Sequence, residues 1–185
     1  MFIVDYSKEA INLIEVMISK DELRKRIREM GKEITEYYKG KTDTLHAVCV
    51  LKGSIHFFSE LVQNIDMNVE YSFIQVSSYS GVSSTGRIRV KSWIDEPIEN
   101  RHVIVVEDIL DTGLTLSYVL EYLRRYRPAD LKVVTLLKKL GRNPQVTPDF
   151  VGFEIEDKFV IGYGLDYNEK YRNLPYIGWV KGDIV

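Results

Sequence analysis

The apolar residues between positions 19 and 40 repeat at intervals of three and four, which predicts one buried face of a helix. They are Leu23, Ile27, Met30, Ile34 and Tyr37. Ser19 and Glu22 have the spacing of a capping box before this pattern, and Gly40 is a suitable terminator after it. We therefore expect an amphipathic helix that covers one side of a core.

Other apolar positions form nearly continuous runs, which are typical of strands buried on both faces of a parallel sheet. Such runs occupy residues 44–51, 69–76, 103–106 and 131–137, with shorter candidates at 151–155 and 159–163. Residues 87–93 instead alternate between apolar and polar, as in a strand with one face in water. Helical patterns occupy residues 55–65 and about 113–123. This alternation predicts an α/β fold with a central, mostly parallel sheet flanked by helices.

The composition narrows the class of protein. The 185 residues contain neither an internal repeat nor a linker, which suits a single domain. The net charge of −2 gives no general attraction to nucleic acid or to a membrane, so we expect neither as a partner, although a local basic cluster would escape this argument. The single cysteine, Cys49, provides no disulfide framework and suits a reducing cytoplasm. The N-terminus lacks a basic leader, and no apolar stretch reaches the ~18 residues of a membrane span.

The most informative segment is residues 103–116, which reads VIVVEDILDTGLTL. Glu107 and Asp108 come at the end of a predicted buried strand, and Asp111 lies in the turn before a predicted helix. Ligands of open α/β sheets bind beyond the carboxyl ends of the strands, and a helix start offers unpaired backbone N–H groups. The segment therefore predicts a phosphate cradle. Its two strand acids are suitably placed to accept hydrogen bonds from ribose hydroxyls.

Two plainer explanations of this segment stay open at this point. An acid-rich turn after a strand also occurs in metal-dependent phosphotransfer proteins, and Asp111 or Thr112 could serve only as a helix N-cap. The residues that follow favour a phosphate site, because Gly113 permits close backbone approach while Thr112 and Thr115 add hydroxyl donors.

Residues 103–116 closely resemble the phosphoribosyl-pyrophosphate motif of type I phosphoribosyltransferases. Three further segments resemble hypoxanthine-guanine phosphoribosyltransferases of bacterial type: residues 48–58 (VCVLKGSIHFF), 77–86 (SSYSGVSSTG) and 149–178 (DFVGFEIEDKFVIGYGLDYNEKYRNLPYIG). The resemblance runs from about residue 44 to residue 178. It implies a type I phosphoribosyltransferase fold in a single domain, residues 1–185, with a core at about 40–145 and a small hood from about 1–18 and 146–185.

The resemblance also implies an activity. The enzyme would transfer the 5-phosphoribosyl group of phosphoribosyl pyrophosphate to N9 of hypoxanthine or guanine, giving IMP or GMP and pyrophosphate in cytoplasmic purine salvage. Mg²⁺ is the implied cofactor, and the purine base and phosphoribosyl pyrophosphate are the implied small-molecule partners. The implied assembly is a homodimer or a homotetramer.

The family's site roles carry over onto matching positions, with Asp111 as general base beside N7 of the purine. The residues expected at the phosphoribosyl group are Glu107, Asp108, Asp111, Thr112, Gly113, Leu114 and Thr115, with Leu114 standing where some relatives have lysine. Those expected at pyrophosphate are Lys52, Gly53 and Arg172. Those expected at the purine are Lys139, Phe159, Val160 and Asp166. Mg²⁺ is expected near Glu107, Asp108 and Asp166, partly through water or ribose hydroxyls.

Several of these residues also have a plain structural explanation. Lys139 at a strand end is ordinarily a solvated charge, and the adjacent Lys138 competes for its role. Phe159 is ordinarily a core residue, and Asp166 is ordinarily a turn residue. Arg172 could form a surface ion pair with Glu169. The resemblance also implies a flexible loop, including Ser78 and Tyr79, that excludes water; the alternative is an ordinary surface loop.

Three questions stay open at this stage. A regulatory relative without catalysis would share the fold and bind nucleotides or RNA. Speaking against it is the joint presence of Asp111, Lys139, Phe159 and Arg172. A xanthine-preferring enzyme would differ only in groups at the edge of the base, which one sequence does not place. The family pattern allows a cis peptide bond between Leu51 and Lys52, where the alternative is a plain strand-to-helix turn.

Overall fold

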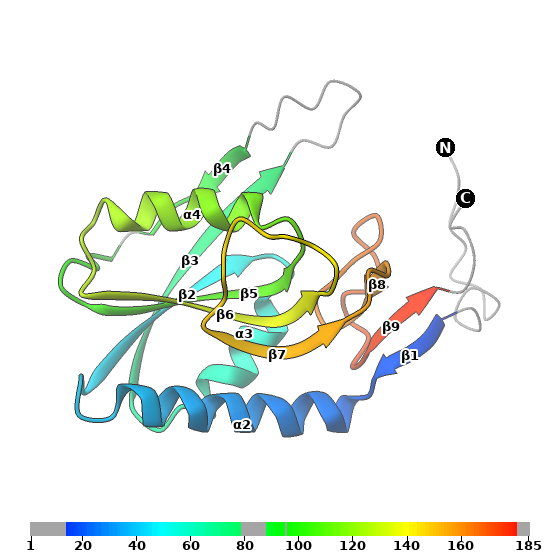
Figure 1. Cartoon of the computed structure of the whole chain (residues 1–185), viewed down its shortest axis with the longest axis horizontal. Helices are drawn as coiled ribbons and strands as arrows, with labels where there is room; N and C mark the ends of the chain where they lie inside the picture. The colour runs from blue at the N-terminus through cyan, green and yellow to red at the C-terminus, as the bar shows by residue number, and fades with distance from the viewer. Residues whose placement is uncertain (1–13, 79–87, 95, 181–185) are drawn as a thin grey trace.

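The computed structural model describes residues 14–78, 88–94 and 96–180, which form two sheets and three helices. The larger sheet has the strand order β4-β3-β2-β5-β6-β7, and the smaller sheet has the order β1-β9-β8 (Figure 1). Along the chain the elements are β1 (Ile14–Ile18), α2 (Lys20–Tyr38), β2 (Thr44–Leu51), α3 (Ile55–Val62), β3 (Asn68–Ser78), β4 (Ile88–Ser92), β5 (His102–Leu110), α4 (Leu114–Arg124), β6 (Asp130–Lys139), β7 (Phe150–Ile155), β8 (Val160–Ile161) and β9 (Ile177–Val180).

The larger sheet is mostly parallel, as the apolar runs predict. Of its described strands, β4 alone pairs antiparallel with its neighbour. The register places His46 of β2 opposite Val103 of β5, and Cys49 opposite Val106. The six middle residues of β2 are all buried, because helices cover both faces of a sheet of this kind.

The helices form the two outer layers. α2 and α3 pack on one face of the larger sheet and α4 packs on the other (Figure 1). The capping box predicted for α2 is present: Ser19 Oγ accepts from the Glu22 backbone N–H at 3.3 Å, and the Ser19 N–H donates to Glu22 Oε2 at 2.9 Å. The predicted stripe is buried, except that Tyr38 rather than Tyr37 completes it.

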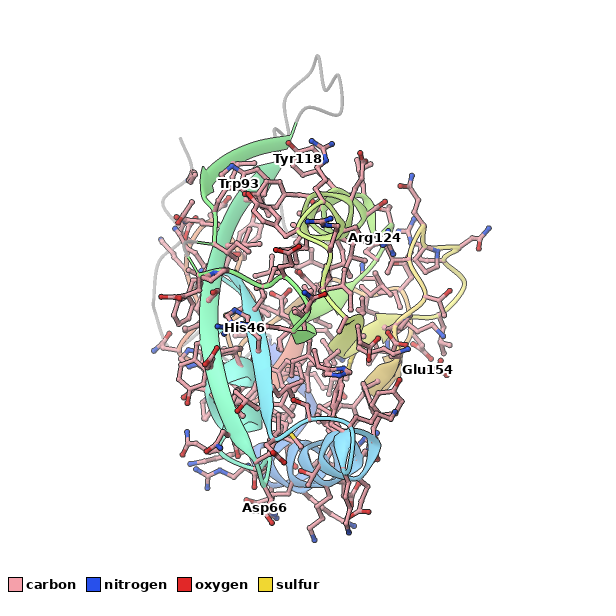
Figure 2. All side chains as sticks on the ribbon, turned by 90° about the vertical axis from the view of Figure 1, so that its left-hand side faces the viewer. His46, Asp66, Trp93, Tyr118, Arg124 and Glu154 are labelled. Atoms are coloured by element: carbon pink, nitrogen blue, oxygen red, sulfur yellow. The ribbon has the colours of Figure 1, made fainter. Side chains whose placement is uncertain are left out.

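Aromatic side chains tie the segment after β4 to α4. The rings of Trp93 and Tyr122 stack with centroids 3.6 Å apart, and Tyr118 lies 6.1 Å from Trp93. Figure 2 shows Trp93 and Tyr118 together at the end of the molecule where α4 lies. The connection from β4 to β5 is thereby held against the helix that follows the motif.

The smaller sheet joins the two ends of the described chain, as expected for a hood. β9 pairs antiparallel with both β1 and β8, although the sequence pattern predicted neither β1 nor β9. One expectation needs correction: β7 falls inside the range assigned to the hood, yet it pairs with β6 and extends the larger sheet. None of the helices in the described part of the chain is long and apolar enough to cross a membrane.

The strand order creates a topological switch point between β2 and β5. From β2 the chain continues outward to β3 and β4, and it then returns to build β5, β6 and β7 on the other side. Such a reversal opens a crevice beyond the carboxyl ends of the two central strands. Figure 1 shows β2, β5, β6 and β7 pointing toward the segment that connects β8 to β9. Residues at the ends of separate strands therefore meet at this edge.

Candidate active site

The segment after β5 forms a small cavity at the start of α4. β5 continues to Leu110, beyond the predicted strand end, because Glu107, Ile109 and Leu110 keep pairing with β6. The N-cap of α4 is Gly113, whose φ of 73° favours glycine. Neither Asp111 nor Thr112 therefore occupies the N-cap position. The cavity has a volume of about 170 Å³ and is lined by residue 107 and residues 109–116.

Unpaired backbone donors face this cavity. The first N–H groups of a helix have no partner within the helix, and here the backbone bonds of α4 begin with Ser117 N–H donating to Gly113 O at 2.8 Å. Leu114 N lies 3.4 Å from the hydroxyl oxygen of Thr112. Amides and hydroxyls converging on a small cavity are suited to an anion such as a phosphate.

Two adjacent carboxylates, Glu107 and Asp108, stand in β5 at the rim of the crevice. Burial raises the pKa of Glu107 well above its usual range, and the charge of Asp108 raises it further. Burial also raises the pKa of Asp108, whose Oδ1 accepts from Ile109 N–H at 2.8 Å. Oε2 of Glu107 is buried and has no hydrogen-bond partner among the described residues. The pair therefore has unused capacity for hydroxyl donors or for a cation.

The turn after β2 lies directly against this carboxylate pair. The Leu51–Lys52 peptide bond is cis, as the family pattern allows. A methyl group added to Gly53 would overlap the carboxylate of Asp108, and one added to Gly164 would overlap the carbonyl oxygen of Gly53. The turn is therefore held between β5 on one side and the segment between β8 and β9 on the other.

Cations and carboxylates from these two segments form a second cluster. Glu169 Oε2 lies 3.0 Å from Lys52 Nζ and 3.1 Å from an Arg172 terminal nitrogen, and that nitrogen is 2.8 Å from Asp166. The Arg172 guanidinium also donates to Gly164 O at 2.7 Å. The hydrogen bonds from Lys52 and Arg172 lower the pKa of Glu169. The surface pairing of Arg172 with Glu169 is thus present, since 65% of the Glu169 side chain is exposed, and the same cluster joins Lys52 to Asp166.

The backbone of this segment is tightly turned. Four of its non-glycine residues have positive φ: Tyr163, Asn168, Glu169 and Tyr171. Tyr163 is anchored because its hydroxyl donates to Glu60 Oε2 of α3 at 2.6 Å. Unusual backbone conformations of this kind often occur at functional sites, where the surrounding structure holds them.

At the other end of the crevice, Lys139 lies beside Asp111. Its Nζ is 3.3 Å from Asp111 Oδ2, and only 12% of the side chain is exposed, so it is not an ordinary solvated charge. Lys138 pairs instead with Glu154, at 2.7 Å. Successive residues of a strand point to opposite faces, so Lys139 is the lysine that the fold brings to Asp111.

Two further residues lie at this end of the site, and the sequence pattern predicted neither. Asp157 Oδ1 lies 2.9 Å from Lys139 Nζ, while Asp157 Oδ2 lies 2.6 Å from Arg142. Arg142 Nε in turn lies 3.2 Å from Asp111 Oδ1. Neither residue belongs to a periodic pattern. The one available signal was the position of Asp157, two residues before Phe159 in the segment that resembled the family.

Phe159 and Val160 lie where the chain enters the hood. Phe159 is 52% exposed and meets Tyr167 edge-on at 5.8 Å, so its explanation as a core residue is wrong. Val160 is buried and pairs with Trp179 of β9. Ser78 ends β3, and Tyr79 lies outside the described residues. An exposed ring next to a fixed strand offers a flat surface for an aromatic ligand.

No group of three or more metal-ligating side chains in the described parts of the chain encloses a metal site by itself. Mg²⁺ commonly takes one or two carboxylates and completes its coordination with phosphate oxygens and water. The unpartnered oxygen of Glu107 beside Asp108 fits that donor set.

The comparisons with known proteins agree on one family. The model of the phosphoribosyl transferase domain matches residues 19–168. The hypoxanthine-guanine phosphoribosyltransferase of Bacillus subtilis (strain 168) is 45% identical over 170 residues, which are 90% of this chain and 93% of that protein. The hypoxanthine-guanine-xanthine phosphoribosyltransferase of Tritrichomonas foetus is 43% identical over 175 residues, or 94% of both chains. A crystal structure of a hypoxanthine phosphoribosyltransferase from Staphylococcus aureus has a TM-score of 0.87 at 39% identity, covering 96% of this chain and 97% of that one.

Proposed function

This chain belongs to the phosphoribosyltransferase family, among the hypoxanthine-guanine phosphoribosyltransferases, and on that premise we propose that it joins the purine base with Asp111 as general base. The reaction moves the 5-phosphoribosyl group of phosphoribosyl pyrophosphate to N9 of hypoxanthine or guanine and releases pyrophosphate. The observation that carries the proposal is the position of Asp111: its backbone lines the cavity at the start of α4, and its carboxylate contacts Lys139. One residue thus stands between a phosphate site and a cation suited to the oxygen of a purine.

The base end of the site suits an oxopurine. Lys139 Nζ donates to the exocyclic oxygen of the base, and a carboxylate oxygen of Asp111 accepts the proton at N7 as the new bond forms. The exposed ring of Phe159 stacks on the base, and the backbone of Val160 reads its opposite edge. Positioned acid–base groups of this kind contribute about 10²–10⁴-fold to rate.

The sugar end divides its tasks between backbone and side chains. Amides from residues 111–115, with the hydroxyls of Thr112 and Thr115, hold the 5-phosphate. Leu114 adds no charge at this point, so binding rests on the helix start. Glu107 and Asp108 accept hydrogen bonds from the ribose hydroxyls, which gives Oε2 of Glu107 the partner that it lacks in the described structure.

The pyrophosphate end is built around cations. Lys52 and Arg172 bind the leaving group together with the backbone of Gly53, and Ser78 and Tyr79 exclude water from the reaction centre. Mg²⁺, when bound, supplies charge neutralisation for the departing pyrophosphate, and the residues suited to hold it are Glu107, Asp108 and Asp166. The absence of a side chain on Gly53 lets the turn pack directly against the carboxylate of Asp108.

A direct assay tests the proposal. The purified protein is incubated with phosphoribosyl pyrophosphate and Mg²⁺, and pyrophosphate release is measured with hypoxanthine, guanine, xanthine and adenine in turn. We expect release with the first two bases. Asp111→Asn should lower turnover about 10²–10⁴-fold and leave the affinity for phosphoribosyl pyrophosphate nearly unchanged. Asp66→Asn, at an exposed aspartate outside the site, is the matched control. Near-normal turnover of Asp111→Asn would remove this residue from the mechanism.

We also propose a homodimer or homotetramer in the cytoplasm, without nucleic acid or membrane partners. The supporting observation is an exposed aromatic surface on β3: Tyr71 is 51% and Phe73 41% exposed, and both rings contact Phe58 of α3 at 5.5–5.7 Å between centroids. Large exposed aromatic groups favour protein contacts. Light scattering after size-exclusion chromatography should give a multiple of 21.5 kDa, and Tyr71→Lys with Phe73→Lys should reduce the mass. A monomeric wild-type mass would overturn the assembly.

A further inference from the structure

Four charged side chains at the base end of the site form a closed ring. Going around it, Lys139 is 3.3 Å from Asp111 Oδ2 and 2.9 Å from Asp157 Oδ1. Arg142 is 3.2 Å from Asp111 Oδ1 and 2.6 Å from Asp157 Oδ2. Each carboxylate therefore meets both cations, one through each of its oxygens. The two positive and two negative charges balance.

The ring is held by parts of the fold outside the motif that carries Asp111. Arg142 lies in the connection from β6 to β7, and Asp157 lies between β7 and β8. The same β6–β7 connection also reaches the phosphate cavity, since Gln145 N–H donates to Thr112 O at 3.0 Å. Gly113 packs beside that backbone, where an added methyl group would lie 3.3 Å from Gln145 N. One loop thus contacts both the general base and the helix start.

The ring has a chemical consequence that rests on the proposed function. Both oxygens of Asp111 lie within 3.3 Å of a cation, but Oδ1 has no hydrogen-bond donor among the described residues and so keeps its capacity to accept one. A purine that draws Lys139 to its own oxygen releases Oδ2 as well, while the charge of Arg142 beside Oδ1 holds the carboxylate in position. Asp157 remains paired with Lys139 while the purine replaces Asp111 as the other partner of the ammonium group.

We infer that Arg142 and Asp157 are positioning residues for the transfer reaction: Arg142 orients Asp111, and Asp157 keeps Lys139 available to the base. Both side chains are 43% exposed, so their replacement does not open a cavity in the core. Their effects should therefore appear in particular kinetic constants rather than in folding. A merely structural pair would change the melting temperature and leave those constants alone.

The first experiment removes the charge of Asp157. In Asp157→Asn both cations are left to Asp111, and Lys139 becomes harder for the base to displace. We expect the KM for hypoxanthine to rise about fivefold, because a partly exposed ion pair contributes a free energy of about this size. The KM for phosphoribosyl pyrophosphate should stay within about twofold of the wild-type value. Asp157→Glu, which keeps the charge, should recover part of the loss. The control is Glu154→Gln, because it breaks the Lys138–Glu154 contact of 2.7 Å on the opposite face of β6.

The second experiment removes the other cation. In Arg142→Gln the carboxylate of Asp111 loses one of its two partners, and we expect kcat to fall about tenfold, with a smaller change in the KM for the base. Arg142→Lys should recover only part of kcat, because one ammonium group does not bridge two carboxylates as a guanidinium does. The Arg142→Gln/Asp157→Asn double variant should lose less than the product of the single effects, since the two residues share one network.

The outcomes separate this inference from the proposed function. If Asp111→Asn abolishes turnover while Asp157→Asn and Arg142→Gln keep wild-type kinetic constants, the positioning roles are overturned and the transfer mechanism stands. If Asp111→Asn stays active, the mechanism itself fails. A lowered melting temperature with unchanged kcat and KM in both ring variants would also reject the positioning roles.

Discussion

Gly53 packs so closely against Asp108 that there is no room for a side chain between them. The two residues come from different strands, since Gly53 follows β2 and Asp108 belongs to β5. Their contact closes the switch point and brings the turn with Lys52 to the acids proposed to hold the ribose. Gly164, pressed against the carbonyl of Gly53 from the other side, fixes the same turn.

Replacing Gly53 by alanine should therefore damage the site. The added methyl group overlaps the Asp108 carboxylate, so either the turn or the acid must move. We expect a loss of about 1–3 kcal/mol in the free energy of unfolding and a fall in kcat/KM for phosphoribosyl pyrophosphate. Urea denaturation and steady-state kinetics measure the two effects. Gly40→Ala is the control: its φ of 75° costs stability, but nothing lies near the new methyl group, so kcat/KM should be unchanged.

The buried pair Glu107 and Asp108 should make the stability of the ligand-free protein depend on pH. The pKa of Glu107 is raised above its ordinary value of 4.5 because burial and Asp108 disfavour its charge. A raised pKa stabilises the fold below the ordinary value, and that contribution is lost as pH rises toward the folded-state pKa. As pH rises above the ordinary pKa, the melting temperature of Glu107→Gln should therefore increase relative to that of the wild type, by about 2–4 °C for each kcal/mol. Parallel melting curves would contradict this assignment.

Glu169 should compete with pyrophosphate for its cations. Its carboxylate occupies Lys52 and Arg172 at 3.0–3.1 Å, although 65% of its side chain is exposed. Glu169→Gln removes the carboxylate that Lys52 and Arg172 share, while Arg172 keeps its contact with Asp166. The KM for phosphoribosyl pyrophosphate should fall about two- to threefold, as expected for exposed ion pairs. Salt should weaken the difference between variant and wild type. Glu156→Gln, which affects only the exposed Lys158 contact, serves as control. An increase in this KM would mean that Glu169 assists binding instead.

The thiol of Cys49 should resist alkylation while the protein is folded. Burial raises its pKa to about 12, and Ser54 Oγ lies 3.2 Å from the sulfur. Since the thiolate is the reactive form, iodoacetamide at pH 8 should leave the native protein unlabelled for hours and modify it rapidly in urea. Mass spectrometry measures the modification. Because the chain has one cysteine, labelling of the native protein would place Cys49 at the surface.

The apolar pattern was sufficient for most of the larger sheet, because a strand buried on both faces needs a continuous apolar run. It was insufficient for β1 and β9, whose pairing is antiparallel and joins residues from the two ends of the described chain, such as Ile14 and Val180. It also misjudged the end of β5, where Glu107 and Asp108 continue the strand despite their charge, because the backbone pairing with β6 is unaffected by side-chain polarity.

The residues of the candidate site can likewise be divided into those that the sequence predicted and those that it did not. Asp111 and its neighbours were predictable because they are contiguous in the chain, and Lys139, Phe159 and Arg172 because a known family supplied their spacing. Arg142, Asp157 and the bridging role of Glu169 were not predictable, since each depends on which side chain reaches across the crevice. The choice between Lys138 and Lys139 likewise needed the direction in which β6 presents each residue.

The reversal of the chain between β2 and β5 limits how the protein can be divided. A fragment spanning residues 103–116 would retain the most recognisable stretch but would lack the turn at Gly53, the lysine of β6 and the arginine near the hood. Inheritance of such a stretch by recombination would therefore not transfer the activity, and cutting the chain into two complementary pieces should restore it only if they reassemble the whole larger sheet.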